Sequence, residues 1–129
     1  MAAIDDLNQV MGPALTGRGF QLDEADDAVW YRKRPAWAVY YRGSECKLQV
    51  CWSAREGGID FMLAPLNAPN EFGLINHSKK WRFMLALSEV NDGLRTPSPD
   101  AGPETWWAWR KALFDTHFEA AHQALLRQH

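Results

Sequence analysis

Apolar and polar residues alternate in the first segment of the chain with the period of a helix. Its apolar positions, three or four residues apart, are Ile4, Leu7, Met11, Ala14 and Leu15. Because such positions lie along one side of a helix, this segment is predicted to form an amphipathic helix. Pro13 removes one backbone donor, which predicts a bend or a restart there, and Gly17 and Gly19 let the chain leave the helix.

The pattern then changes to the two-residue period of strands. Four segments of β-forming composition follow one another at 28–34, 36–42, 46–53 and 59–64. In the third, Cys46, Leu48, Val50 and Trp52 alternate with mostly polar residues, which predicts a strand with one face in water. The connections are too short for a parallel crossover, so the four strands are predicted to pair antiparallel. Before them, the acidic run from Asp23 to Asp27 is typical of a solvated turn.

Two segments of the C-terminal half have helical spacing. Residues 78–90 favour a short helix, although their apolar positions also alternate like those of a strand. Pro103 followed by Glu104 opens a long helix that is predicted to end near Leu126. Its core side is predicted to carry Trp107, Phe114, Phe118, Ala121 and Leu125.

These elements predict a single α+β domain over residues 1–129. An antiparallel sheet of about four strands, spanning residues 28–64, would pack against the N-terminal and C-terminal helices, with one shorter helix in between. No apolar run approaches the ~20 residues of a membrane helix. The N-terminus carries acid where a signal peptide carries lysine or arginine. We therefore expect a cytoplasmic protein without membrane contacts.

Reactive groups are scarce in the sequence. His117 and His122 are five residues apart, so on a helix they cannot hold one metal ion together. Cys46 and Cys51, also five apart, are predicted to lie on opposite faces of a strand as reduced thiols. The signature of a serine-hydrolase elbow is absent, and Gly17-Arg18-Gly19 lacks the context of a dinucleotide-binding loop. We therefore assign no catalytic residue, metal or cofactor and lean against an enzyme.

Aromatic residues are in excess. The chain has seven tryptophans, more than a core of this size needs. On the last helix, with Trp107 at the centre of the core side, Trp106 lies about 100° away and Trp109 about 160° away. Leu113 extends this apolar arc, which is wider than packing on a sheet requires. The arc would be covered by the short helix, by another protein chain or by a ligand in a cavity.

Charge is uneven along the chain, although the net charge is only −2. Residues 1–30 carry six acids and one base, whereas residues 31–60 carry six bases and three acids. Within residues 30–42, basic residues alternate with aromatic ones, as on surfaces that stack single-stranded bases. In the simpler interpretation the aromatic side chains point inward and the bases outward, which makes nucleic acid an unlikely partner.

A few motifs near the N-terminus resemble a known family. They are Pro13-Ala14-Leu15, then Gly19-Phe20, and Trp30-Tyr31-Arg32 at the start of the strands. This part of the chain, about forty residues, is similar to small bacterial domains of unknown function, and related domains occur among toxin-immunity and contact-dependent competition proteins. The resemblance implies a helix, a Gly-Phe turn and an antiparallel meander, and it implies no catalytic residues.

Three functional hypotheses follow. In the first, the protein is a non-enzymatic immunity-like or adaptor-like module that binds a protein partner or itself through Trp106, Trp109, Leu113, Trp37, Tyr40 and Arg42. In the second, it binds a small ligand, or acts as an enzyme, in a pocket between sheet and helices lined by Trp52, Trp81, Trp107 and His117. In the third, residues 30–42 bind single-stranded nucleic acid.

Overall fold

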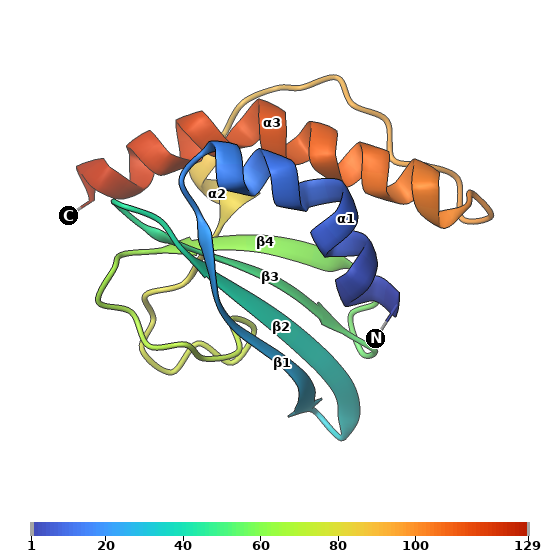
Figure 1. Ribbon diagram of the computed structural model, residues 1–129, viewed down its shortest axis with the longest axis horizontal. Helices are drawn as coiled ribbons and strands as arrows, with labels where there is room; N and C mark the ends of the chain where they lie inside the picture. The colour runs from blue at the N-terminus through green and yellow to red at the C-terminus, as the bar shows by residue number, and fades with distance from the viewer. Residues whose placement is uncertain (1, 129) are drawn as a thin grey trace.

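The computed structural model describes residues 2–128, and the chain forms an antiparallel sheet with helices on one side (Figure 1). The predicted α+β class is confirmed. The elements are α1 (Ala2–Gly17), β1 (Gln21–Tyr31), β2 (Arg34–Arg42), β3 (Lys47–Ser53), β4 (Ile59–Ala64), β5 (Arg82–Phe83), α2 (Met84–Ser88) and α3 (Pro103–Arg127). The helix α1 runs through Pro13 to Gly17 as one element, so the predicted restart does not occur.

The sheet has five strands in the order β1-β2-β3-β4-β5, all antiparallel, one more than predicted. The first strand was predicted to begin at residue 28 and extend to 34, which is wrong. The chain turns instead at Arg32 and Lys33, which both have positive φ, 49° and 66°. This is the backbone of a two-residue hairpin turn, which glycine and asparagine usually occupy. Because arginine and lysine occupy it here, the amino-acid types did not indicate a turn.

The acidic run from Asp23 to Asp27 is part of strand β1 and does not form the predicted turn. The register between β1 and β2 shifts twice, between Leu22 and Glu24 and between Asp26 and Val29. An edge strand pairs on one side only, and here most of its side chains are exposed, so charged residues are tolerated. Charges and bulges at an edge also oppose pairing with other chains.

One face of the sheet packs against the helices. Side chains of β3 and β4 that point to this face, such as Leu48 and Leu63, contact apolar residues of α1 and α3. The predicted core side of α3 is confirmed, because all five of its residues are buried: Trp107, Phe114, Phe118, Ala121 and Leu125. Figure 1 shows α1 and α3 lying together above this face. The predicted packing of both terminal helices on the sheet is therefore correct.

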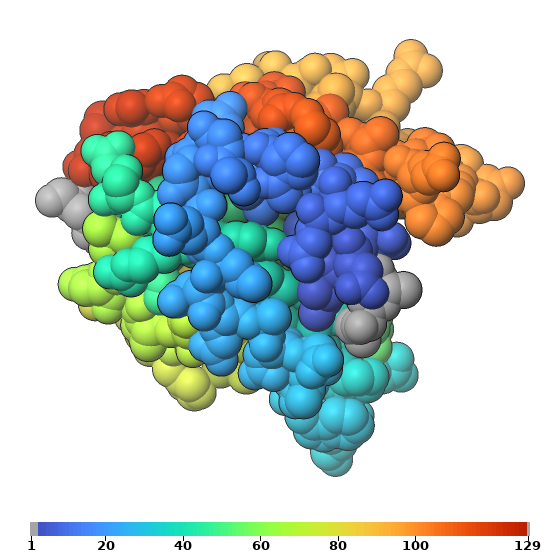
Figure 2. Space-filling model, in the orientation of Figure 1, coloured from blue at the N-terminus to red at the C-terminus, as the bar shows by residue number. Residues whose placement is uncertain are grey.

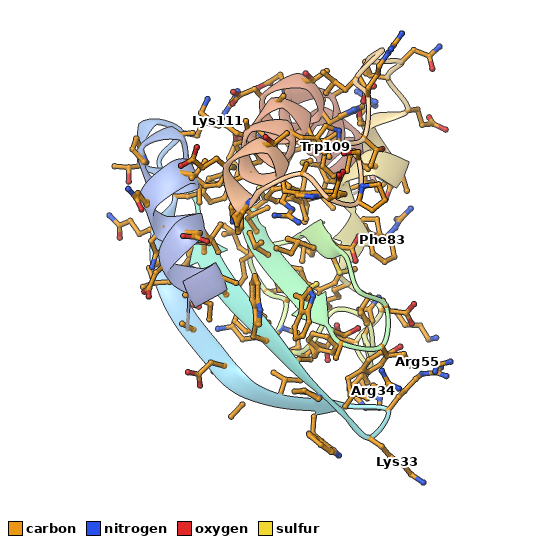
Figure 3. All side chains as sticks on the ribbon, turned by 90° about the vertical axis from the view of Figure 1, so that its right-hand side faces the viewer. Lys33, Arg34, Arg55, Phe83, Trp109 and Lys111 are labelled. Carbon is orange, nitrogen blue, oxygen red and sulfur yellow. The ribbon has the colours of Figure 1, made fainter. Side chains whose placement is uncertain are left out.

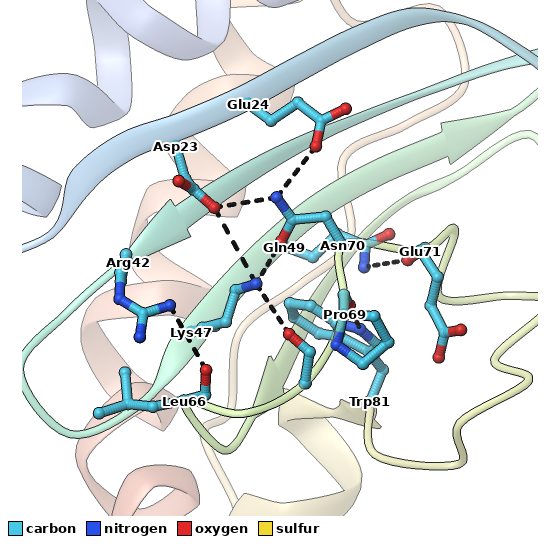
Figure 4. A network of polar contacts seen from close by, with 11 residues as sticks. Asp23, Glu24, Arg42, Lys47, Gln49, Leu66, Pro69, Asn70, Glu71 and Trp81 are labelled. Carbon is cyan, nitrogen blue, oxygen red and sulfur yellow. Dashed lines mark hydrogen bonds and ion pairs between the residues drawn. The ribbon is translucent and has the colours of Figure 1, made fainter.

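The other face of the third strand was predicted to lie in water, and this prediction is wrong. The β3 side chains on it are buried: Lys47, Gln49, Cys51 and Ser53. The segment 65–81 folds back over this face and places Ala68, Phe72 and Trp81 against it. Gln49 Nε2 donates to the Glu71 carbonyl (3.0 Å), and Lys47 Nζ donates to the Ala68 carbonyl (2.9 Å) (Figure 4). The polar residues of β3 therefore hold this covering loop in place.

The segment 78–90 is helical only at Met84–Ser88, where it forms α2. Arg82 and Phe83 pair with β4 as strand β5. The strand interpretation of this segment therefore holds for these two residues, and the helix interpretation holds for α2. Trp81, which fits the predicted helical side, packs on the loop-covered face instead. The helix ends at Glu89, whose backbone is left-handed (φ 54°).

Candidate functional site

An open groove of about 1080 Å³ lies between the helix-packed face of the sheet and α3. Its walls come from α1, from strands β2 to β5, from α2 and from the first half of α3. In Figure 3, Trp109 lies on the side of α3 that faces Phe83, whereas Lys111 points away on the opposite side. We call this cavity the aromatic groove, because most of its wall is apolar and much of it is tryptophan.

Five of the seven tryptophans line the aromatic groove, and they are Trp37, Trp52, Trp106, Trp107 and Trp109. The three on α3 lie in its first turns, which extend past α1 (Figures 1 and 2). The rings of Trp106 and Trp109, three residues apart on the helix, meet edge to face with their centres 5.6 Å apart. The aromatic excess noted in the sequence is therefore concentrated at one site.

The residues predicted for partner binding divide between two places. Four of them line the aromatic groove: Trp106, Trp109, Leu113 and Trp37. Tyr40 faces the opposite side of the sheet, where its ring lies 5.9 Å from that of Trp81. Arg42 is exposed at the end of β2 and donates to the Leu66 carbonyl (3.4 Å). Alternation along β2 explains the division, because Trp37 and Tyr40 are three residues apart and point to opposite faces.

The residues predicted to line a pocket are divided in the same way. Trp52 and Trp107 line the aromatic groove, whereas Trp81 and His117 do not. Trp81 is buried under the loop 65–81, and its indole Nε1 donates to the Pro69 carbonyl (2.9 Å). His117 is buried behind α2 and is held by other side chains. Half of the set therefore lines a cavity between the sheet and the helices.

Sequence reasoning missed a chain of hydrogen bonds through His117. Its Nδ1 lies 2.7 Å from the Ser88 hydroxyl, and its Nε2 contacts the Asp92 carboxylate. The hydrogen bond from His117, followed by that from the Leu94 backbone, lowers the pKa of Asp92. His117 is 29 positions from Ser88 and 25 positions from Asp92 in the sequence, so no local motif indicates this arrangement.

This Ser88–His117–Asp92 chain has the residue types of a hydrolase triad but not its surroundings. None of the three residues lines the aromatic groove, and Ser88 is buried. The Ser88 hydroxyl also accepts the Val90 amide (3.3 Å). A nucleophile must reach its substrate. The arrangement instead ties the end of α2 and the residues after it to α3.

Charged groups are few in the aromatic groove. Arg110 lies on its α3 wall, with its guanidinium carbon 4.8 Å from the centre of the Trp107 ring and 5.5 Å from that of Trp106. Burial lowers the pKa of Arg110. Asp60 of β4 also borders the groove, but it pairs with Cys51 and its side chain points to the loop-covered face, where burial, followed by repulsion from Glu56, raises its pKa.

Two buried donors at the groove have no hydrogen-bond partner among residues 2–128. They are the indole Nε1 of Trp109 and the guanidinium Nε of Arg110. Buried polar groups in proteins nearly always form hydrogen bonds, so two donors without partners on residues that line a cavity need an explanation. Both atoms are donors, and both belong to adjacent residues of α3.

Cys51 in β3 and Cys46, just before this strand, point to opposite faces of the sheet, as predicted, and both thiols are free and buried. Burial, with a smaller contribution from Glu45, raises the pKa of Cys46 to about 12. Burial also raises the pKa of Cys51, with a contribution from Asp60. At neutral pH both groups are therefore protonated thiols, which are poor nucleophiles.

The residues predicted to stack nucleic-acid bases are mostly buried. Tyr31, Trp37, Tyr40 and Tyr41 are all less than a tenth exposed, whereas Trp30 is 67% exposed. A stacking platform needs several accessible rings. Of these aromatic side chains, only that of Trp30 is exposed enough to stack on a base.

Within residues 2–128, no group of three or more histidine, cysteine, aspartate or glutamate side chains is placed to hold a metal ion. None of the helices in this range is both long and apolar enough to cross a membrane. Neither finding adds a second candidate site to the aromatic groove.

Comparison with models of protein families, with curated proteins and with solved structures gives no match. A function for this chain is therefore inferred from the geometry of the aromatic groove.

Proposed function

We propose that this protein is a non-enzymatic binding protein that holds a small apolar ligand in the aromatic groove. The observation that carries the proposal is the convergence of five of the seven tryptophans on one open cavity. Small-molecule sites are concave, mostly apolar and about 300–1,000 Å³ in volume, and this groove, at about 1080 Å³, is slightly larger. Of the five, Trp52, Trp106 and Trp109 are only partly buried, and aromatic surface of this kind gains free energy when a ligand covers it.

The chemistry of the walls supports binding over catalysis. Among the described lining residues, the titratable side chains are Asp6, Asp60 and Arg110, and no serine, threonine, cysteine, histidine or lysine is included. The wall therefore supplies neither a nucleophilic hydroxyl or thiol nor an imidazole base. What it does supply is a broad apolar surface with a few polar groups, which suits recognition of a ligand.

A thermal-shift screen with small aromatic compounds, neutral and charged, tests the proposal. A ligand that binds the folded state raises the melting temperature, and at 100 times its Kd it adds about 2.7 kcal/mol. We expect hits to quench tryptophan fluorescence and to lose affinity in Trp109→Ala. The matched control is Trp30→Ala, because Trp30 is exposed and lies outside the groove. A screen without hits, or hits that bind both variants equally, would contradict the proposal.

A second candidate function is the binding of a protein partner along the same groove. Two apolar side chains on its rim, Phe83 and Leu85, are 42% and 50% exposed, and such side chains are typical of surfaces that another protein covers. An immunity-like role, such as related domains of the resembling family have, would use this mode. Leu85→Glu should then reduce association measured by sedimentation, or by capture of a purified partner.

A further inference from the structure

Arg110 is the only basic residue among the described residues that line the aromatic groove. Its side chain is partly buried, and its Nε is fully buried without a hydrogen-bond partner in residues 2–128. The guanidinium lies over the rings of Trp106 and Trp107. These contacts favour a cation through the ring electrons, but they leave the hydrogen-bond donors of the group unused.

The positive charge of Arg110 is not neutralised within the described chain. No ion pair joins it to a carboxylate. Asp6 and Asp60 belong to the same groove but come from α1 and β4, and neither contributes to the pKa shift of Arg110, which burial alone causes. Partial burial of an unpaired cation costs free energy that a bound anion would recover.

The neighbouring Trp109 adds a second unused donor. Its buried indole Nε1 also lacks a partner among the described residues, and it lies one position before Arg110 on α3. Donors can be satisfied only by acceptors, so the polar part of a ligand at this wall must present acceptor atoms. A carboxylate does so with two oxygens in one plane, which matches the planar guanidinium.

We propose that the ligand of the aromatic groove is an amphipathic carboxylate, whose aromatic or branched apolar body lies among the tryptophans and whose carboxylate binds the guanidinium of Arg110. This inference rests on the proposed function. A monoanion fits better than a phosphate dianion, because Arg110 has no second basic residue beside it among the described lining residues. Asp6, on the α1 wall of the groove, is acidic and disfavours an anion on that side, which leaves the α3 wall for the carboxylate.

Matched pairs of acids and amides test the inference by isothermal titration calorimetry. The probes are phenylacetate, 1-naphthaleneacetate and 4-biphenylacetate, each paired with its neutral primary amide of nearly the same shape. We expect the wild-type protein to bind at least one acid about tenfold more tightly than its amide, as one charge-assisted bidentate contact implies. In Arg110→Gln this preference should disappear while the affinity for the amide stays within about twofold. Arg110→Lys, which keeps the charge but not the planar fork, should give an intermediate preference.

The control is Lys111→Gln, which removes the same charge from the next residue of α3. Lys111 points away from the groove and pairs with Asp115 (2.7 Å), so its loss should leave the preference for the acid unchanged (Figure 3). An equal loss in both variants would mean a long-range effect of net charge and would overturn the role of Arg110.

The remaining outcomes separate the two proposals. If wild-type protein binds acids and amides equally, or if Arg110→Gln keeps the preference, the carboxylate inference is overturned and the groove remains a ligand site. If no member of any pair binds, the proposed function fails together with the inference. The comparison of acid and amide in the wild-type protein needs no variant, so it can be made even if a variant protein fails to fold.

Discussion

The two faces of the sheet treat their polar groups in opposite ways. On the face covered by the loop 65–81, buried Gln49 both donates to the loop (3.0 Å) and accepts from it (2.9 Å). On the face covered by helices, the groove leaves donors of Trp109 and Arg110 unpaired among the described residues. A third unpaired nitrogen, Nε2 of His122, lies elsewhere on α3 with Glu45 at 3.6 Å. This difference supports the proposal that the groove binds a ligand, because folding alone satisfies the polar groups of the loop-covered face but not these donors.

The largest difference should appear when one tryptophan on each face is removed. Trp81→Ala should cost about 3–5 kcal/mol of folding free energy, because Trp81 is only 1% exposed and its loss leaves a closed cavity. Trp109→Ala should cost about 1 kcal/mol, because its ring borders a groove that is already open. Urea denaturation monitored by circular dichroism measures both. Equal losses would mean that Trp109 is as much a part of the core as Trp81.

The hydrogen bonds of the loop-covered face give the next effect. Gln49→Leu leaves the Gly73 amide and the Glu71 carbonyl without their partner and should destabilise the fold by about 1–3 kcal/mol. Gln123→Leu is the control, since Gln123 is exposed and bonds only to Glu119 on the same helix. The midpoint of urea unfolding reports both values. A Gln49 variant as stable as the control would show that the loop is held by apolar contacts alone.

The chain through His117 should contribute a smaller amount. Ser88→Ala removes one hydrogen bond to His117 and should cost about 1 kcal/mol of stability. It should not change ligand affinity, because Ser88 lies outside the aromatic groove. Ser98→Ala, in the exposed segment before α3, serves as the control. A Ser88 variant that keeps full stability but loses binding would place this chain in the functional site.

The smallest effect concerns pH and the partly buried carboxyl group of Asp60 on β4. Burial raises the pKa of Asp60 in the folded state, so the folded protein holds this proton more tightly than the unfolded chain does. Stability should therefore decrease as the pH rises from 3.8, the ordinary pKa of the group, through the raised pKa, and then level off. Asp60→Asn should remove this part of the pH dependence. Parallel profiles of urea stability against pH for the two proteins would show that the charge of Asp60 costs nothing.

The sequence predicted the helix-packed face well. There, a regular apolar period is enough to specify the packing, as in the alternation of Leu48 and Val50 on β3 and the buried positions of α3. The loop-covered face was mispredicted because Lys47 and Gln49 look like surface residues until their partners are known. Those partners belong to the segment 65–81, which has no periodic pattern.

The candidate site could be predicted only in outline. The surplus of tryptophans indicated a covered aromatic surface, and Trp107, one of the residues predicted to line a pocket, lines the groove. The sequence did not distinguish Trp107 from Trp81, because both fit a helical pattern and only the short strand β5 places Trp81 on the other face. The unpaired state of Arg110 depends on which carboxylates the fold brings near it, which no local pattern contains.

The most direct test of the central claim follows the indole signals of all seven tryptophans in a ¹⁵N–¹H correlation spectrum. On titration with the tightest aromatic carboxylate, the signals of the five groove residues should shift: Trp37, Trp52, Trp106, Trp107 and Trp109. The signals of Trp30, which is exposed, and Trp81, which is buried on the other face, should stay in place. Unmoved groove signals, or shifts of Trp30 or Trp81 as large as theirs, would contradict the claim that the aromatic groove is the ligand site.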